Sequence, residues 1–349
     1  MNVELYCCEK DAGINTPSQK YIDLFFLNKI VCNKQLEKMW RRKLLVLPRW
    51  FLFPISKVNI LLNRLIPGGN FHMIGSNDIT EISANSDRDI YNLLEKFKPH
   101  LKFTEQEEAD GQKFLQNLGF KKNDKFVCLL VRDSGYLNRH HKYSNEDLSR
   151  WTYHSFRDGN IDRYVLAAEE LAARGYYVFR MGINVLKKFN LSNPKIIDYA
   201  NSKLRSDFMD IYLGAKCNFC ISAGGPGFYG IPFIFRRPNV HIQVPFGHLP
   251  TGNKYDLMIT KNHISDKSKK KLTFSEIFSN KVALSYTQEE FDKQNVILDE
   301  NSPEEIRDLS IEMDERLNGS WLETDEDLEL QTKFWRIFEE NIKKQNLKK

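Results

Sequence analysis

Short apolar runs and amphipathic stretches alternate along the central part of the sequence. Residues 126–131 (Phe-Val-Cys-Leu-Leu-Val) and 176–181 (Tyr-Tyr-Val-Phe-Arg-Met) have the composition of buried strands, and apolar residues recur at helical spacing from Ile161 to Ala172, before Gly175. This alternation is typical of a mainly parallel sheet. A strand, helix, strand unit places its two strands side by side through a right-handed crossover. We therefore expect 126–131 and 176–181 to be parallel neighbours in one sheet.

A second unit of the same kind follows. It comprises a strand at 195–197, a helix at 207–214 with Ser206 as its N-cap, and a strand at 217–221 that leads into a Ser-Ala-Gly-Gly-Pro-Gly turn. Because strands and helices continue to alternate, these elements predict an α/β domain over residues 120–320.

The N-terminal part shows shorter alternations, which predict another α/β domain over residues 1–119. The elements expected there are strands at 3–7, 29–32, 44–47 and 71–74, and helices at 34–40 and 90–97. At 349 residues the chain also exceeds the size at which a single core usually stops growing. The polar residues around Gly119 favour a boundary between the two domains at that point.

The C-terminal residues are expected to be helical. Ser302, Pro303 and Glu305 combine an N-cap, a proline in the first helical turn and the acid of a capping box. The segment 321–349 predicts a last helix with aromatic side chains, and we expect this helix to pack back on the N-terminal domain.

The net charge is small but unevenly distributed. A net charge of +5 is too low to indicate a protein that binds nucleic acid. Residues 34–64 hold eight Lys or Arg against one acid, Glu37, whereas residues 299–329 hold thirteen acids against two arginines. The N-terminal part is therefore the basic one.

The six cysteines are expected to be reduced, structural thiols. Cys217 and Cys220 have the spacing of half a zinc site, but they fall in a predicted strand, and no second pair has ligand spacing. Four of the six lie in apolar runs, where cysteine behaves as a small hydrophobe. Reduced thiols fit a reducing compartment, and the chain opens without a secretory signal. We therefore expect a cytoplasmic protein with no metal and no cofactor.

Residues 44–66 are strongly apolar, yet they do not predict a membrane-spanning helix. Pro48, Pro54 and charged residues interrupt them, whereas a spanning helix needs about 20 mainly apolar residues. One interpretation is a strand followed by a helix that faces the core. The other is a basic amphipathic surface that binds anionic lipid at the inner face of the cytoplasmic membrane. The aromatic residues that would take part are Trp40, Trp50 and Phe51.

Two arginines at strand ends are the main candidates for ligand binding. Arg132 and Arg180 each follow an apolar run, and ligands of open α/β sheets bind beyond the carboxyl ends of the strands. A guanidinium group offers a permanent charge and a fork of donors suited to a diphosphate. Ser222, Gly224 and Gly225 would bring backbone N–H groups close to the same anion. The structural alternatives are an ion pair between each arginine and a neighbouring acid, and a plain tight turn.

A polar loop of about 30 residues separates the strand at 126–131 from its helix, and loops of that length inside a compact domain are usually functional. A histidine or carboxylate can take the proton of an acceptor hydroxyl when its pKa is suitably tuned. The candidates for this base are Asp133, His154 and Asp158. Further residues expected to contact a nucleotide sugar are Tyr136, Arg157, Gly182 and Arg205.

Two Asp-x-Asp strings, Asp87-Arg-Asp89 and Asp325-Glu-Asp327, match the metal-binding string of transferases of another architecture. Neither follows an apolar strand. Both precede helical patterns, where acids interact favourably with the helix dipole. We interpret them as helix starts and expect a diphosphate leaving group to be stabilised by arginines and backbone amides without a metal.

Several longer motifs resemble those of a known family. They are Asn33-Lys-Gln-Leu-Glu-Lys-Met-Trp40, Arg132-Asp-Ser-Gly-Tyr-Leu-Asn138, Ser155-Phe-Arg-Asp-Gly-Asn-Ile-Asp162, Gly175-Tyr-Tyr-Val-Phe-Arg-Met-Gly182 and Asp198-Tyr-Ala-Asn-Ser-Lys-Leu-Arg-Ser-Asp-Phe-Met-Asp-Ile211. In this order, and over most of the chain, they resemble a family of bacterial glycosyltransferases associated with surface-polysaccharide synthesis. The resemblance implies a GT-B architecture, in which two Rossmann-like domains face a cleft and the C-terminal domain holds the donor nucleotide sugar.

The sequence departs from that family at its start. Family members carry an Arg-Ile-Gly-His-like loop ahead of the first strand, and this sequence begins after that point. We therefore expect the acceptor-side domain, residues 1–119, to be truncated at its start.

The function expected from the residues and the resemblance is transfer of a sugar from a nucleotide-diphosphate donor to a hydroxyl of a glycan or lipid-linked glycan. Two other classes remain open. A nucleotide-sugar epimerase on the same fold would consume donor without an acceptor. A non-catalytic, transferase-like subunit would bind nucleotide or membrane.

Overall fold

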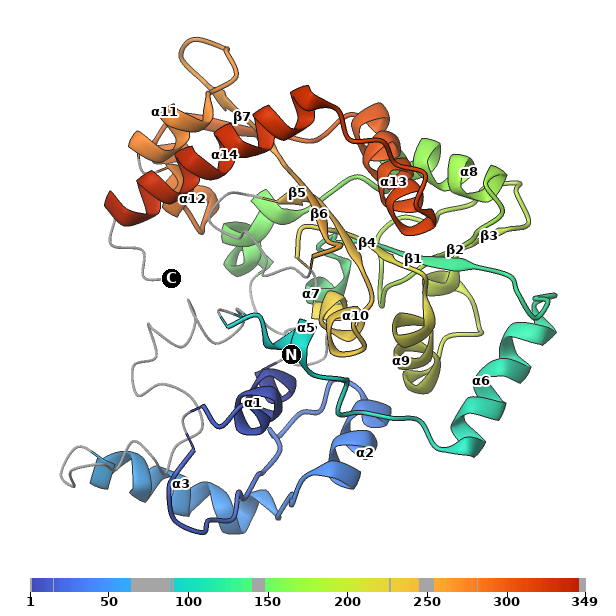
Figure 1. The fold of residues 1–349 in the computed structure, drawn as a ribbon, viewed down its shortest axis with the longest axis vertical. Helices are drawn as coiled ribbons and strands as arrows, with labels where there is room; N and C mark the ends of the chain where they lie inside the picture. Colours follow the sequence, from blue (N-terminus) through green and yellow to red (C-terminus); the bar gives the residue numbers. More distant parts are fainter. Residues whose placement is uncertain are drawn as a thin grey trace. The chain divides into compact units, whose positions relative to one another are not determined.

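The computed structural model describes residues 2–14, 16–63, 89, 91–139, 148–225, 227–244, 254–280 and 282–344. The chain divides into two compact units (Figure 1). The first unit comprises Met1–Asn123, Arg205–Lys216 and Gly230–Arg237, and the second comprises Asp124–Leu204, Cys217–Tyr229 and Pro238–Lys349.

The second unit is built on a six-stranded parallel sheet of strand order β3-β2-β1-β4-β5-β6. The strands are β1 (Phe126–Val131), β2 (Tyr177–Arg180), β3 (Ile196–Ile197), β4 (Cys220–Ala223), β5 (Asn239–Val244) and β6 (Leu257–Thr260). The expected parallel pairing of the first two strands is confirmed, since Leu129 of β1 lies opposite Arg180 of β2. The α/β class is therefore confirmed, and β1 lies at the point where the strand order reverses, where such sheets bind ligands.

Helices α8 (Val165–Ala173) and α13 (Pro303–Asn318) pack against each other and against this sheet (Figure 1). Their buried residues, among them Leu171, Ile306 and Met313, join the side chains of the central strands in one core. The helix start predicted at Ser302 is confirmed, because its side chain and that of Glu305 form a complete capping box. Burial of every β1 residue agrees with a strand that is covered on both faces.

Short helices connect the strands at their carboxyl ends. They are α7 (Gly135–Arg139), η2 (Leu148–Arg157), η3 (Ile161–Tyr164), η4 (Tyr199–Asn201) and η5 (Gly227–Tyr229). The segment η2 is held by Phe156, whose ring is buried against Phe291 with 5.4 Å between the ring centroids. This anchor positions the polar residues on either side of Phe156.

A smaller antiparallel sheet completes the second unit. It pairs β7 (Asn262–Ser265) with β8 (Val296–Asp299) and packs with α11 (Phe274–Ser279), η7 (Val282–Leu284), α12 (Gln288–Lys293) and α14 (Asp325–Lys344). Phe334 of α14 contacts Phe274, and Phe338 contacts Phe278. The last helix thus packs on α11 within its own unit, and its expected packing on the N-terminal domain stays a prediction.

The regular elements of the first unit, in the part of it that the structure describes, are helices joined by irregular segments. Its helices are α1 (Asn2–Asp11), α2 (Lys34–Lys43), α3 (Arg49–Asn63), α5 (Leu93–Lys96), α6 (Glu105–Asn117), α9 (Asp207–Lys216) and α10 (Gly230–Ile234). The predicted helix at 34–40 and the N-cap at Ser206, whose hydroxyl accepts from Met209 N at 3.1 Å, are both confirmed. No helix in the described ranges is long and apolar enough to cross a membrane.

The strands predicted in the N-terminal part are largely wrong. Residues 3–7 lie in α1, residues 29–32 form no regular element, and 44–47 contribute one isolated parallel bridge between Phe25 and Val46. Residues 71–74 lie outside the described residues. The error at 3–7 has a clear cause, because a short apolar run does not distinguish strand from helix. The two-domain GT-B arrangement therefore stays a proposal.

A buried ionic cluster joins the chain segments of the first unit. Glu4 of α1 is fully buried and accepts from the Arg236 guanidinium at 2.7 Å and from His100 N at 3.3 Å. The Arg236 side chain also donates to the backbone carbonyls of Leu94 and Phe97. His100 continues the cluster, since its Nδ1 lies 3.1 Å from Glu4 and its Nε2 lies 2.9 Å from an Asp11 carboxylate oxygen.

We predict that Glu4→Ala destabilises the first unit by about 3 kcal/mol, since removal of one partner leaves the other charge of a buried pair uncompensated. The carbonyl partners of Arg236 keep the loss at the low end of the usual range. Urea unfolding measures the change, with Lys10→Ala, which breaks the more exposed pair to Asp23, as the control. Equal unfolding midpoints for the two variants would show that the Glu4 cluster contributes nothing specific.

Candidate functional site

The carboxyl ends of β1 and β4 meet at a turn in which two glycines have left-handed backbone angles. Gly224 has φ +73° and Gly225 has φ +60°. A Cβ atom on Gly224 would lie 2.0 Å from the Arg157 carbonyl oxygen and 3.3 Å from the Arg132 Cβ. Glycine is therefore required at position 224 both for its backbone angle and for the close approach of η2.

Arg157, the last residue of η2, binds this turn directly. Its Nε donates to the Gly224 carbonyl at 2.9 Å, and a terminal nitrogen donates to the Gly225 carbonyl. Burial lowers the pKa of Arg157, and the nearby Arg132 lowers it further. The guanidinium group remains charged, because arginine does not deprotonate in proteins at physiological pH.

Arg132 directly follows β1, and its Cβ lies close to Gly224 of the glycine turn. It donates to the Asp158 carboxylate and, at 3.2 Å, to the backbone carbonyl of His154. Burial raises the pKa of Asp158, whereas the charge of Arg132 opposes that rise. The structure thus brings together four residues singled out from the sequence, Arg132, His154, Arg157 and Asp158, around the glycine turn.

His154 is neutral at physiological pH. Burial, followed by the charges of Arg157 and Arg132, lowers its pKa to about 4. Its Nδ1 is buried and has no hydrogen-bond partner among the residues that the structure describes. The ring lies against Tyr153, with 3.8 Å between the ring centroids. An uncharged imidazole therefore lies close to two guanidinium groups.

Arg180 has a different environment from Arg132. It is fully buried at the end of β2, donates to Asp198 at 3.3 Å and lies 4.0 Å from Asp133. Asp133 in turn accepts from Gly135 N and Leu186 N, each at 2.9 Å. Arg180 therefore has the ion-pair arrangement that the sequence left open as an alternative, and burial lowers its pKa.

The remaining candidates are spread more widely. Ser222 is buried in β4 with its hydroxyl 3.3 Å from His241 Nδ1, and Tyr136 is half-buried on α7. Gly182, after β2, has φ +145°. Arg205 belongs to the first unit and pairs with Asp210 at 2.7 Å, so its expected part in a nucleotide site stays a prediction.

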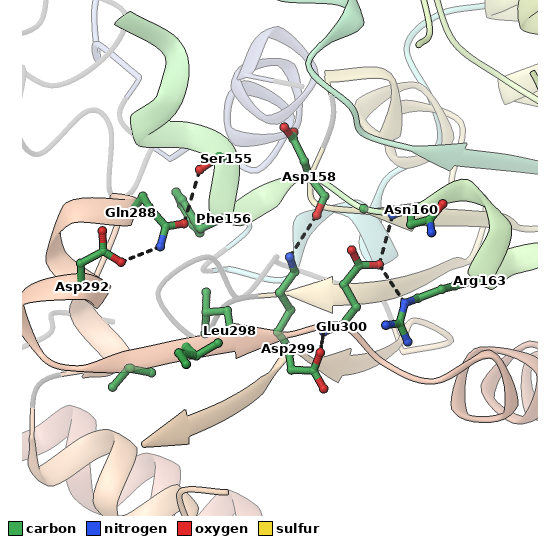
Figure 2. Close-up of a pocket in the computed structure, with 14 residues that line it drawn as sticks. Ser155, Phe156, Asp158, Asn160, Arg163, Gln288, Asp292, Leu298, Asp299 and Glu300 are labelled. Carbon is green, nitrogen blue, oxygen red and sulfur yellow. Dashed lines mark hydrogen bonds and ion pairs between the residues drawn. The ribbon is translucent and has the colours of Figure 1, made fainter. Parts of the chain in front are cut away.

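A cavity of about 560 Å³ lies beside Asp158 (Figure 2). Lys261, just after β6, is buried there and donates to the Asp158 carbonyl at 3.0 Å. Glu300 accepts from Asn160 N at 3.1 Å and also pairs with Arg163. A smaller cavity of about 150 Å³ is lined by Asp133, Arg180 and Asn160 among others, so Asn160 borders both.

Lys261 and Glu300 are not among the residues predicted from the sequence. For Lys261 a signal exists in the sequence, a charged residue at the end of a mainly apolar run, the same kind of signal that indicates Arg132; Glu300 follows Asp299 and has no such signal. The run that precedes Lys261 is residues 257–260 (Leu-Met-Ile-Thr).

The described Asp-x-Asp residues behave as helix starts. Asp89 accepts from Leu93 N and Leu94 N, both at 2.7 Å, and Asp327 accepts from Thr324 N at 3.0 Å at the start of α14. Asp87 lies outside the described residues.

The ligand atoms of Glu4, Cys8 and His100, in the first unit, lie within 4.8 Å of one another, as those of a metal site would. The Arg236 guanidinium, 3.5 Å from Cys8 Sγ, supplies positive charge there and opposes a cation.

Comparisons of the chain with protein-family models, with curated proteins and with solved structures give no match.

We predict that Gly224→Ala destabilises the second unit. The left-handed backbone angle alone costs about 1 to 3 kcal/mol at a non-glycine residue. The added methyl group also displaces the Arg157 carbonyl. Gly227→Ala is the matched control, because no atom lies within 4 Å of its Cβ position. Thermal and urea unfolding report the difference, and a Gly224→Ala protein as stable as the control would contradict the close approach.

Proposed function

We propose that the protein is a glycosyltransferase that moves a sugar from a nucleotide-diphosphate donor to a hydroxyl of a glycan or lipid-linked glycan. One observation carries this proposal. Two arginines border the glycine turn where the strand order of a parallel sheet reverses: Arg157 donates to its carbonyls, and the Cβ of Arg132 lies close to Gly224. Two permanent cations at that edge suit a diphosphate.

The two arginines would act on the leaving group. As the bond between the sugar and the diphosphate oxygen breaks, negative charge grows on the diphosphate, and preorganised positive groups lower the barrier by stabilising that charge. Arg157 is fixed by the carbonyls of the glycine turn, and Arg132 by Asp158 and the His154 carbonyl. Little reorganisation of either guanidinium group is then needed during the reaction.

Arg180 would act through its neighbours. It lies within an arrangement of Asp133 and Asp198 that also fixes the loop at Leu186. We assign it the role of a positioning residue that holds the carboxyl end of β2 and the loop after β1 together.

His154 is the residue that we propose as proton acceptor for the hydroxyl that attacks the sugar. It is uncharged, and its buried Nδ1 is unpartnered among the described residues. A pKa of about 4 makes it a weak base. A bound diphosphate would offset the charges of Arg132 and Arg157, raise the pKa of His154 and so strengthen it as a base.

We predict that Arg132→Ala and Arg157→Ala each raise the dissociation constant of a nucleoside diphosphate by about one to two decades. A hydrogen bond to a charged group contributes roughly 1.5 to 3 kcal/mol, and each 1.4 kcal/mol corresponds to one decade. Arg307→Ala on α13 is the control, since Arg307 pairs locally with Asp308. Calorimetry with UDP, GDP, CDP and dTDP measures the binding, and folded variants that bind as tightly as the parent would refute the diphosphate site.

The same nucleotides distinguish the functional classes. Product that appears only when donor and acceptor are both present supports the transferase. Conversion of the donor sugar without an acceptor would indicate an epimerase, and nucleotide binding without any turnover would indicate a non-catalytic subunit.

We predict that a bound nucleoside diphosphate raises the pKa of His154 from about 4. The complex then takes up a proton between the free and bound pKa values, so the affinity increases as pH falls through that interval. His263 is the internal control, since burial chiefly lowers its pKa to about 4. NMR titration with and without nucleotide measures both residues, and a His154 pKa that does not move would remove it from the site.

A further inference from the structure

Helix α3 presents an apolar face to solvent, which is the reverse of the usual arrangement for a surface helix. Trp50 is 79% exposed, Leu61 is 65% exposed and Val58 is 56% exposed. The buried residue of the helix is Leu52 on its other side, where Ser56 and Asn59 are half-buried. The helix is drawn in light blue in Figure 1.

The exposed apolar residues form one continuous stripe, which we call the α3 apolar face. At 3.6 residues per turn they fall within an arc of about 140° around the helix axis. The members of the α3 apolar face are Trp50, Phe51, Pro54, Ile55, Val58, Leu61 and Leu62. Their helical spacing separates this feature from the scattered apolar residues that every protein surface carries.

The opposite side of α3 is fixed to its own unit. The Arg49 guanidinium carbon lies 4.2 Å from the centre of the Phe53 ring, and Arg49 donates to the Leu27 carbonyl at 3.3 Å. Phe53 also contacts the Phe26 ring, with 5.9 Å between the ring centroids. These contacts determine which side of the helix faces outward.

The sequence on both sides of α3 carries charge of one sign. The sequence from Lys38 to Asn77 holds seven Lys or Arg and no acid. Some of these cations are neutralised within the unit, as Arg42 is by Glu107 at 3.0 Å. Lys43 and Lys57 are exposed, and Lys57 lies on α3 itself. An apolar stripe that starts with Trp and Phe, with Lys57 at its edge in a basic stretch of sequence, is the composition of a helix that lies in a lipid interface.

Trp40 does not belong to this surface. The sequence placed it with Trp50 and Phe51, but it is buried on α2. The exposed aromatic residues of α2 and α3 are therefore Trp50 and Phe51, at the start of α3.

We propose that the α3 apolar face binds an anionic lipid surface, with Trp50 and Phe51 at the boundary between headgroups and acyl chains and the neighbouring lysines on the anionic headgroups. A second copy of the chain is a poorer occupant, because a symmetric contact would bring the cations of the two copies together. An anionic membrane offers acyl chains to the α3 apolar face and negative headgroups to the lysines. Each Lys or Arg near such a surface contributes roughly 1 kcal/mol to binding.

The test uses the full-length protein and vesicles of phosphatidylcholine with or without phosphatidylglycerol. We expect co-flotation with the anionic vesicles, weakening with added salt as the charges are screened, and a shift of tryptophan emission to shorter wavelength. Val58→Glu and Leu61→Glu should each lower the partition coefficient at least tenfold. Leu330→Glu, at an exposed leucine of α14, should leave it unchanged.

Three results would overturn the proposal. One is absence of binding to anionic vesicles at low salt. Another is a concentration-dependent oligomer that Leu61→Glu dissociates, which would make a second copy the occupant. The third is a large loss of thermal stability in Val58→Glu without any change in flotation, which would indicate that other residues of this chain cover the α3 apolar face.

Discussion

The close approach of η2 to the turn after β4 sets the geometry of the candidate site. Because Gly224 has no side chain, the Arg157 carbonyl can lie where a Cβ atom would otherwise be. That approach lets the Arg157 side chain reach the turn carbonyls and brings His154 and Asp158 beside Arg132. The anchor of η2 on its far side is Phe156, in the apolar cluster of the small antiparallel sheet.

The candidate site holds two neighbouring positive charges, Arg132 and Arg157, and one carboxylate, Asp158. Arg132 and Arg157 already have partners, and the uncharged state of His154 is partly their consequence. An anion would thus compete with Asp158 for Arg132, and it would also relieve the repulsion between the two guanidinium groups. The proposed diphosphate ligand would therefore have to replace an internal carboxylate, and its several charged oxygens would do so better than a single carboxylate.

Much of the second unit could be predicted from the sequence, whereas in the first unit the helix at 34–40 and the helix after Ser206 were predicted and the strands were not. Fully apolar runs such as 126–131 and a complete capping signal at Ser302 are local and unambiguous. The run at 3–7 is ambiguous, and α1 is fixed by a Glu4 contact to Arg236, 232 residues away. At the site, Arg132 was found because it directly follows a strand. The contact of Arg157 with Gly224 depends on how a long loop returns to the sheet, which no local pattern encodes.

The first unit is assembled from three separate stretches of chain, the last of which ends at Arg237. Its buried Glu4 cluster therefore cannot close during synthesis until Arg236 has left the ribosome. The strands β1, β2 and β4 are made before that point. Until then the N-terminal segment stays incompletely buried. A fragment ending near residue 120 would likewise lack Arg236, which neutralises Glu4. Domain truncation, a routine tool for two-domain proteins, would here remove part of the core it is meant to isolate.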